Sequence, residues 1–324
     1  LDVVGYNYQD QFFTDDHRQF PSRIIYGSEV LPYYRAGREL FREYGERNPW
    51  YDTADNNFVA GYFIWSGVDY LGESSGWPSM GWPTAPFDVC MFEKPYAAFL
   101  RAVWNPDKPA VSIAVVDQSL DIDPGKDLWT WPMIASHWTF PQYRGRILHV
   151  QTITNCEEVE LWVNGVTLGR RRLADYANNT IQWRAPWRPG SIVAKGYNGG
   201  VETAVCELKT AGQPARIELT ADKTSPVADG QDLTHVTVRL LDENGTAVPN
   251  SDLPVTFEVA GEGRLIGVDN GDLRNHEPRK GNRRTTYFGR ALAIIQSTRT
   301  GGVITLRATA PGLPESLLTV STQE

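Results

Sequence analysis

Short apolar runs that end in polar or aromatic residues recur through the N-terminal part of the chain. Residues 3–8, 24–29 and 59–65 form three such runs, and each has the length and composition of a buried strand. Residues 33–44 and 94–104 carry helical patterns between and after these runs. Alternation of strands and helices predicts an α/β fold for this part of the chain.

From about residue 111 onward, short alternating runs separated by turn signals replace that pattern. Residues 160–168 predict a β-hairpin, because Asn164-Gly165 suits the two central positions of a type I′ turn. Residues 191–197 predict a further strand. We therefore expect an immunoglobulin-like β-sandwich over residues 111–211.

A second β-domain is predicted to begin near residue 213. Residues 215–221 open it, and residues 236–240 alternate as a half-buried strand does. Its segment 228–249 resembles bacterial immunoglobulin-like modules. The predicted domains are therefore an α/β part at 1–104, a sandwich at 111–211, and a second immunoglobulin-like sandwich at 213–324.

Composition narrows the function classes. The 324 residues carry a formal net charge of -8, which argues against nucleic acid or an anionic membrane as a partner. No apolar run approaches the about 20 residues that a membrane span requires. The chain has 11 Trp, 14 Tyr and 12 Phe, which suits a carbohydrate site, although Trp also fills β-sandwich cores. No Gly-rich phosphate loop and no HExxH motif is present, and neither a cofactor nor a metal is expected.

Glu29 is the first candidate for chemistry, because it stands at the end of the second run. In a parallel α/β barrel, catalytic groups lie at the C-terminal ends of the strands. A lone carboxylate after a strand is more often a solvated loop residue. Tyr8 and Trp65, however, end the neighbouring runs and could line a sugar site together with Glu29.

Residues 2–8, 24–29 and 61–73 resemble, in this order, the last three barrel strands of glycoside hydrolase family 2, which includes β-galactosidases and β-glucuronidases. The resemblance continues through residues 94–104 into the C-terminal β-domains and so covers nearly the whole chain. It implies a multidomain fold, in which the last three strands of a partial (β/α)8 TIM barrel precede two all-β immunoglobulin-like sandwiches. It also implies a β-linked carbohydrate as substrate.

The resemblance assigns roles to Glu29, Tyr8 and Trp65, and the position of Asn7 beside Tyr8 suggests a role for it as well. Glu29 matches the nucleophile of a retaining β-glycosidase, and Tyr8 matches the tyrosine that donates a hydrogen bond to it. Asn7 is expected to bond a sugar hydroxyl, and Trp65 to form a wall of the sugar subsite. The alternatives are structural: Tyr8 packs on a loop, Asn7 caps its strand, and Trp65 fills the barrel core.

Asp69 and Glu73 follow in the loop after the third run, and both could accept hydrogen bonds from sugar hydroxyls. A structural ion pair or a cap explains each of them equally well. Trp77 and Trp82, further along this loop, could form an outer subsite. The expected substrate-binding residues are thus Tyr8, Asn7, Trp65, Asp69 and Glu73.

One half of the catalytic pair is missing from the sequence. The general acid/base of the family is a Glu that follows Asn at the end of the fourth barrel strand, and this chain contains no Asn-Glu. We therefore expect this chain to be the C-terminal part of a longer retaining β-glycosidase, with β-galactosidase as the favoured activity. We expect the chain to be inactive without the N-terminal part of that enzyme. Galactose, glucuronate, mannose and glucose specificities all occur on this barrel. The alternative is a non-catalytic carbohydrate-binding or structural module made of β-sandwich domains.

Four further questions have alternatives that stay open. Asp15, Asp16 and His17 could bind a metal, but a solvated linker is the favoured interpretation. Cys156 and Cys206 could pair in an oxidising compartment or remain free thiols. A periplasmic or secreted bacterial location is expected, and assembly into a homo-oligomer stays open. A basic cluster could bind an anionic polysaccharide, although a solvated hairpin is favoured; it comprises Arg274, Arg279, Lys280, Arg283 and Arg284.

Overall fold

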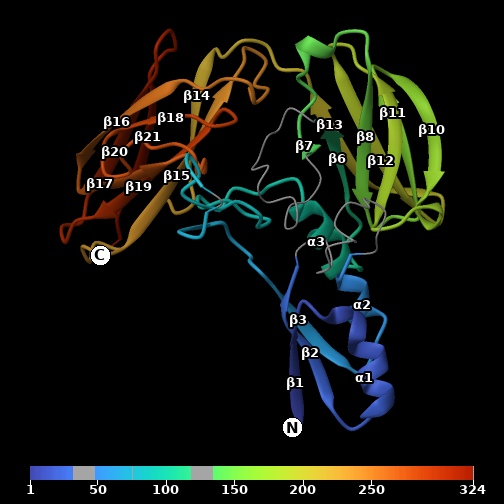
Figure 1. Cartoon of the computed structure of the whole chain (residues 1–324). Helices are drawn as coiled ribbons and strands as arrows, with labels where there is room; N and C mark the ends of the chain where they lie inside the picture. The colour runs from blue at the N-terminus through green and yellow to red at the C-terminus, as the bar shows by residue number, and fades with distance from the viewer. Residues whose placement is uncertain (32–47, 75, 118–133, 324) are drawn as a thin grey trace. The chain divides into compact units, whose positions relative to one another are not determined.

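The computed structural model describes residues 1–31, 48–74, 76–117 and 134–323 (Figure 1). The helix that the sequence predicts over residues 33–44 lies outside these described residues. No helix in the described part is long and apolar enough to cross a membrane. The chain forms two compact units, of which the first comprises Leu1–His137 and Gln142–Leu208, and the second Trp138–Pro141 and Lys209–Glu324.

The first unit opens with a parallel three-stranded sheet. Its strands are β1 (Val3–Asn7), β2 (Ile24–Val30) and β3 (Val59–Ile64), in the spatial order β1-β2-β3. The three strands predicted from the apolar runs are therefore confirmed. The connections contain the 3-10 helix η1 (Asp10–Phe12), α1 (Phe13–Gln19) and α2 (Trp50–Ala54). The linker between β1 and β2, expected to be solvated, is thus largely helical.

The two faces of this parallel sheet differ, because side chains alternate along a strand. One face packs against α1, where Phe13 and Ile25 are almost wholly buried, and Figure 1 shows the two helices beside the sheet. On the opposite face, Val3, Ile24 and Phe63 are 51%, 50% and 65% exposed. The sheet therefore presents an apolar face to solvent.

After β3 the chain forms a hairpin and a third helix. The hairpin strands, β4 (Tyr70–Leu71) and β5 (Gly81–Trp82), lie within the segment expected to be a loop. The helix α3 (Ala97–Trp104) falls within the helix predicted over residues 94–104, which is confirmed. It leads directly into the first sandwich.

The helix α3 and the first sandwich share a hydrophobic core. Phe99 and Leu100 of the helix pack with Ile153 of the sandwich, and all three are at most 5% exposed. The side-chain amide of Asn155 donates hydrogen bonds to the carbonyl oxygens of Asn105 at 3.0 Å and Lys108 at 2.9 Å. The parallel sheet is therefore tied to the sandwich through α3 and the turn that follows it.

The first sandwich consists of two four-stranded sheets, with strand orders β10-β9-β12-β13 and β11-β8-β6-β7. Its strands are β6 (Val111–Val116), β7 (Ile134–Ala135), β8 (Ile147–Thr154), β9 (Glu158–Val163), β10 (Val166–Arg172), β11 (Thr180–Pro186), β12 (Ser191–Asn198) and β13 (Val201–Lys209). Val150, Leu161 and Trp183 are at most 1% exposed between the sheets.

The predicted β9–β10 hairpin is confirmed. Asn164 and Gly165 have φ angles of 49° and 78°, so both occupy the left-handed region that a type I′ turn requires. Cys156 and Cys206 are both free thiols, so the alternative of a disulfide between them is wrong for this structure.

The second unit is a second sandwich, with strand orders β14-β15-β19-β17 and β18-β16-β20-β21. Its strands are β14 (Arg216–Ala221), β15 (Leu233–Leu241), β16 (Pro254–Gly261), β17 (Gly263–Asp269), β18 (Arg283–Thr285), β19 (Arg290–Ser297), β20 (Val303–Thr309) and β21 (Ser316–Ser321). Val238, Phe257 and Leu306 are among its fully buried core residues. The strands predicted at 215–221 and 236–240 are confirmed.

The basic cluster of this second sandwich is partly internal. Arg284 is 0% exposed, and its Nη2 donates to Oδ1 of Asp269 and to Oδ1 of Asn270, both at 2.9 Å. Nε of Arg279 donates to the other oxygen of Asp269 at 2.6 Å. The interpretation as a solvated hairpin is therefore wrong for Arg284, whose charge holds the turn after β17.

Candidate active site

Main-chain hydrogen bonds bring the ends of the three parallel strands into line. In the register of β1 and β2, Asn7 lies opposite Glu29. The N–H of Tyr8 donates to the carbonyl of Glu29 at 2.7 Å, and the N–H of Trp65 donates to the carbonyl of Val30 at 2.9 Å. Because the carboxyl ends of parallel strands meet at one edge of a sheet, Asn7, Tyr8, Glu29 and Trp65 share that edge.

The Glu29 carboxylate accepts a hydrogen bond at each of its two oxygens. The hydroxyl of Tyr8 donates to Oε1, and Nδ2 of Asn7 donates to Oε2 at 3.2 Å. The hydroxyl of Ser28 donates to Oδ1 of Asn7 at 2.7 Å, which leaves the Asn7 amide nitrogen directed at Glu29. These contacts orient the carboxylate. Asn7 thus contacts Glu29 in this structure, a partner that the sequence did not suggest, and Ser28 was not foreseen at all.

Tyr8 is held for this contact by its backbone. Its φ angle is 57°, in the left-handed region that a bulky residue rarely adopts and that is found preferentially at functional sites. Burial, followed by the hydrogen bond to Glu29, raises the pKa of Tyr8 well above its usual value. The phenol therefore keeps its proton at neutral pH and acts as a hydrogen-bond donor. The prediction that Tyr8 contacts Glu29 agrees with this geometry.

Trp65 belongs to a second group of side chains beside Glu29. Nε1 of Trp65 donates to the hydroxyl of Tyr70 at 3.1 Å, and Tyr70 donates to Oε2 of Glu73 at 2.5 Å. The two rings meet edge to face, with centroids 5.9 Å apart. Burial, followed by the hydrogen bond to Glu73, raises the pKa of Tyr70 to about 12. Trp65 is 38% exposed at the strand end, where its ring is accessible in this structure.

No role was predicted for Tyr70 from the sequence, although it lies between the candidate residues Asp69 and Glu73. Its spacing of three residues from Glu73 is the signal that could have found it, since a tight turn brings such residues together. Tyr70 joins Trp65 to Glu73, and these three side chains with Glu29 and Tyr8 make up the candidate site.

Asp69 does not join this group. Its side chain is buried, and Nζ of Lys94 donates to its two carboxylate oxygens at 2.7 and 2.8 Å. The N–H of Ala85 donates to Oδ1 of Asp69 at 2.9 Å, and Lys94 also donates to the carbonyl of Pro83 at 2.8 Å. The expectation that Asp69 binds a sugar is therefore not supported, and the structural ion pair is the role that the structure shows. Lys94 and Asp69 fix the path of the loop that carries Tyr70 and Glu73.

The two tryptophans of the loop have unlike surroundings. Trp82 is 6% exposed within β5, whereas Trp77 is 82% exposed. A sugar can reach only the second of them in this structure. The expectation of an outer subsite formed by both rings is therefore wrong for Trp82.

The sequence triplet after β1 does not form a metal site. Asp15 pairs with an arginine of its own helix, Asp16 accepts a hydrogen bond from Tyr6 at 2.5 Å, and the ring of His17 stacks on Phe58 at 3.8 Å between centroids. Across the described ranges, no group of three or more His, Cys, Asp and Glu residues could hold a metal ion.

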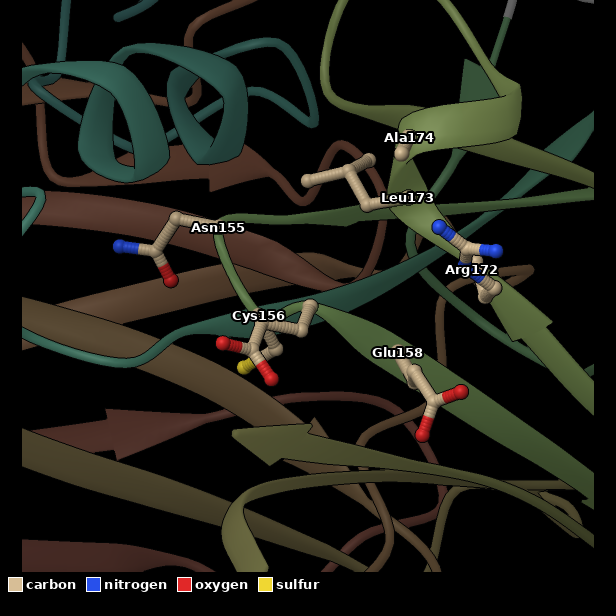
Figure 2. A pocket seen from close by; sticks show the side chains of 7 residues that line it. Asn155, Cys156, Glu158, Arg172, Leu173 and Ala174 are labelled. Carbon is tan, nitrogen blue, oxygen red and sulfur yellow. The ribbon is translucent and has the colours of Figure 1, made fainter. Parts of the chain in front are cut away.

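A separate hollow lies on the first sandwich (Figure 2), with a volume of about 520 Å³. Two of its polar side chains already have partners within the fold. Asn155 donates to Asn105 and Lys108, and Glu157 accepts a hydrogen bond from the N–H of Gly199 at 2.7 Å. The strand-end group therefore remains the candidate site. The hollow is lined by Asn155, Cys156, Glu157, Glu158, Arg172, Leu173 and Ala174.

Comparison with known proteins identifies the family. Residues 217–319 match the model of glycoside hydrolase family 2 C-terminal domain 5, and residues 145–204 match that of a domain of unknown function, DUF4982. The β-galactosidase BoGH2A of Bacteroides ovatus is 30% identical over 100% of this chain and 39% of its own length. A glycosyl hydrolase family 2 crystal structure from Bacteroides cellulosilyticus, 31% identical, superposes with a TM-score of 0.90. The chain belongs to glycoside hydrolase family 2.

The match to that crystal structure covers 100% of this family 2 chain and 42% of the other chain. A β-glucuronidase structure from glycoside hydrolase family 2 also covers 100% of the chain, with a TM-score of 0.75 at 17% identity, and so shares its fold. A protein named β-galactosidase and a protein named β-glucuronidase are thus both similar to this chain. The chain spans about two fifths of the length of the first two relatives.

Proposed function

We propose that this family 2 chain carries the nucleophile of a retaining β-glycosidase, and that Glu29 is that nucleophile. The observation that carries the proposal is the pair of hydrogen bonds from Tyr8 and Asn7, one to each oxygen of the Glu29 carboxylate. A carboxylate that must attack a carbon atom benefits from being fixed in direction before the reaction. Trp65, which the main-chain ladder places beside it, supplies an aromatic wall for a pyranose.

The reaction is a double displacement at the anomeric carbon. One oxygen of Glu29 forms a bond to that carbon, while the bond to the leaving oxygen breaks and a second carboxylic acid gives this oxygen its proton. Water then attacks the same carbon, gives a proton to the second carboxylate, and releases Glu29. Tyr8 and Asn7 hold the Glu29 carboxylate through both steps. Two inversions leave the β-configuration unchanged.

We further propose that residues 1–104 supply the last three strands of a TIM barrel. Three parallel strands in the order β1-β2-β3, with helices on one face, are what consecutive barrel strands form. The exposed apolar face with Val3, Ile24 and Phe63 corresponds to the packed interior of such a barrel. The second carboxyl group, which must lie about 5–5.5 Å from Glu29, then belongs to a part of the enzyme outside these 324 residues.

The proposed substrate is a terminal β-galactoside. Support comes from the relative BoGH2A, a β-galactosidase that is 30% identical over the whole of this chain. Because the chain covers 39% of that relative, much of the sugar site belongs to segments that are not compared. We therefore also propose that these 324 residues alone do not turn over β-galactosides.

Trapping of the intact enzyme with a 2-deoxy-2-fluoro β-galactoside tests the assignment of Glu29. The fluorine slows the second displacement, so the glycosyl-enzyme accumulates and the labelled peptide can be mapped by mass spectrometry. We expect the label on the peptide that contains Glu29 and no label in the Glu29→Gln variant. A label on another carboxylate would refute the assignment. Turnover of aryl β-glycosides by residues 1–324 alone would place the acid/base within the chain, with Glu73 as the first suspect.

A further inference from the structure

The candidate site contains two carboxylates, and no cation in the described part of the chain pairs with either of them. Glu29 accepts hydrogen bonds from Tyr8 and Asn7, and Glu73 accepts one from Tyr70, so every donor to either group is neutral. Neither carboxylate forms an ion pair with Lys or Arg among the described residues. Because no described Lys or Arg pairs with the half-buried Glu29 or the exposed Glu73, the two carboxylates leave this group with a net negative charge.

The two carboxylates lie in one connected group of side chains at the strand ends. Trp65 extends the ladder beside Glu29, and the hydrogen bonds from Trp65 to Tyr70 and from Tyr70 to Glu73 lead from that strand end to the second carboxylate. The pKa of each tyrosine is also raised by the charge of the carboxylate to which it does not hydrogen-bond. The charge of Glu73 raises the pKa of Tyr8, after burial and Glu29, and the charge of Glu29 is among the causes that raise the pKa of Tyr70.

Glu73 is placed to accept a further hydrogen bond. Tyr70 occupies its Oε2, and the side chain is exposed to solvent at the end of the group. A carboxylate has about four acceptor positions, so a sugar hydroxyl can share Glu73 with Tyr70. A carboxylate on the substrate has no proton to donate at neutral pH and would meet two like charges instead.

We infer that the Tyr70–Glu73 pair selects an uncharged hexose and rejects a uronate in the subsite beside Glu29. Glu73 accepts a hydrogen bond from a hydroxyl of the neutral sugar and repels the carboxylate of a glucuronide. Tyr70 is the positioning residue, since it fixes Glu73 and the indole of Trp65 together. The inference rests on the proposed function and narrows it, because β-galactosidases and β-glucuronidases both resemble this chain.

The test compares kcat/KM of the intact enzyme on 4-nitrophenyl β-galactoside and 4-nitrophenyl β-glucuronide. We expect the unmodified enzyme to prefer the galactoside by about a hundredfold or more, as repulsion of an unpaired charge allows. Glu73→Gln keeps the shape of the side chain and removes its charge. It should lower the ratio of galactoside to glucuronide kcat/KM at least tenfold, chiefly because glucuronide turnover rises.

Two further variants separate the roles. Glu93→Gln is the matched control, because Glu93 pairs with Arg101 outside the group, and it should leave the ratio unchanged. Tyr70→Phe removes one hydroxyl and keeps both charges. It should preserve the preference for the galactoside but raise KM for it more than it lowers kcat, without a matching loss in Tm.

The outcomes distinguish the inference from the proposed function. A ratio that Glu73→Gln leaves unchanged, or an unmodified enzyme that prefers the glucuronide, overturns the inference and leaves Glu29 as nucleophile untouched. A loss of about 10²–10⁴-fold on the galactoside with an unchanged ratio makes Glu73 the general acid instead. Absence of turnover on both substrates, together with no labelling of Glu29, overturns the proposed function and the inference with it.

Discussion

Tyr8 and Glu29 are joined twice, once through the main chain and once through their side chains. The N–H of Tyr8 donates to the carbonyl of Glu29 at 2.7 Å, and the phenol of Tyr8 donates to Oε1 of the same residue. The left-handed backbone at Tyr8, with φ 57°, allows one residue to make both contacts. The position of the phenol is therefore fixed relative to the carboxylate by the strand itself.

Removal of the Tyr8 hydroxyl should impair catalysis more than folding. Tyr8→Phe keeps the ring and deletes the donor to Glu29, so we expect kcat/KM of the intact enzyme to fall at least tenfold, about 1.4 kcal/mol. Tyr6→Phe is the matched control, because it deletes a phenol that bonds Asp16 on the helical side of the same strand. Equal losses of kcat/KM in both variants would contradict a special role for Tyr8.

Trp65 should contribute to binding of the sugar. Its ring is 38% exposed at the strand end, and the apolar face of a pyranose suits such a surface. Trp65→Ala in the intact enzyme should lower kcat/KM at least tenfold, about 1.4 kcal/mol of transition-state stabilisation. Trp65→Phe keeps an aromatic face but loses the hydrogen bond to Tyr70, so its kcat/KM should lie between those of the wild type and Trp65→Ala. A variant that loses thermal stability but retains kcat/KM would make Trp65 a packing residue.

The sequence predicted the strands and their end residues because both follow from local patterns. Apolar runs of strand length marked β1, β2 and β3, and polar or aromatic residues at their ends marked Tyr8, Glu29 and Trp65. The type I′ turn at Asn164-Gly165 followed in the same way from two adjacent residues. The family resemblance then supplied the order of the motifs.

The remaining features depend on partners that are distant in the sequence. Asp69 was given a sugar as one of two roles, and the deciding partner is Lys94, 25 positions later. Arg284 reads as one of several surface cations until the fold brings Asp269 against it. Charge and spacing cannot show such pairings, because a folded chain sets which carboxylate meets which cation.

The α/β part of the chain should depend on the first sandwich for its order. Phe99 of α3 is 2% exposed in the core that α3 shares with that sandwich. Phe99→Ala should cost about 3–5 kcal/mol of stability and increase cleavage within residues 1–104 in limited proteolysis. Phe257→Ala, in the core of the second sandwich, is the control and should increase cleavage within residues 215–324 instead. The reverse pattern would show that residues 1–104 are stable without this contact.

Acid should destabilise the first unit through His137. Burial lowers the pKa of His137 from its usual 6.5 to about 4, although the charge of Asp117 acts in the opposite direction. Between these two pH values the unfolded chain binds a proton that the folded chain does not, so stability falls as the pH falls from 6.5 towards 4. The expected loss from this group is about 2 kcal/mol between pH 7 and pH 5.

The comparison of wild type with His137→Gln isolates this contribution. The variant cannot titrate at this position, so its unfolding midpoint should decline less steeply between pH 7 and pH 5. Parallel pH profiles for the two proteins would assign the acid sensitivity to other groups.

The ladder that aligns the strand ends consists of peptide groups, which every residue type except proline provides in full. The backbone positions of Tyr8, Glu29 and Trp65 therefore depend little on the identity of most surrounding side chains. A family member only 17% identical still has this fold, with a TM-score of 0.75. Under the proposed function, we expect mutations in the loop after β3 to change sugar specificity without shifting the Glu29 carboxylate. Libraries aimed at new glycosidase specificities should therefore vary that loop and leave the three strands alone.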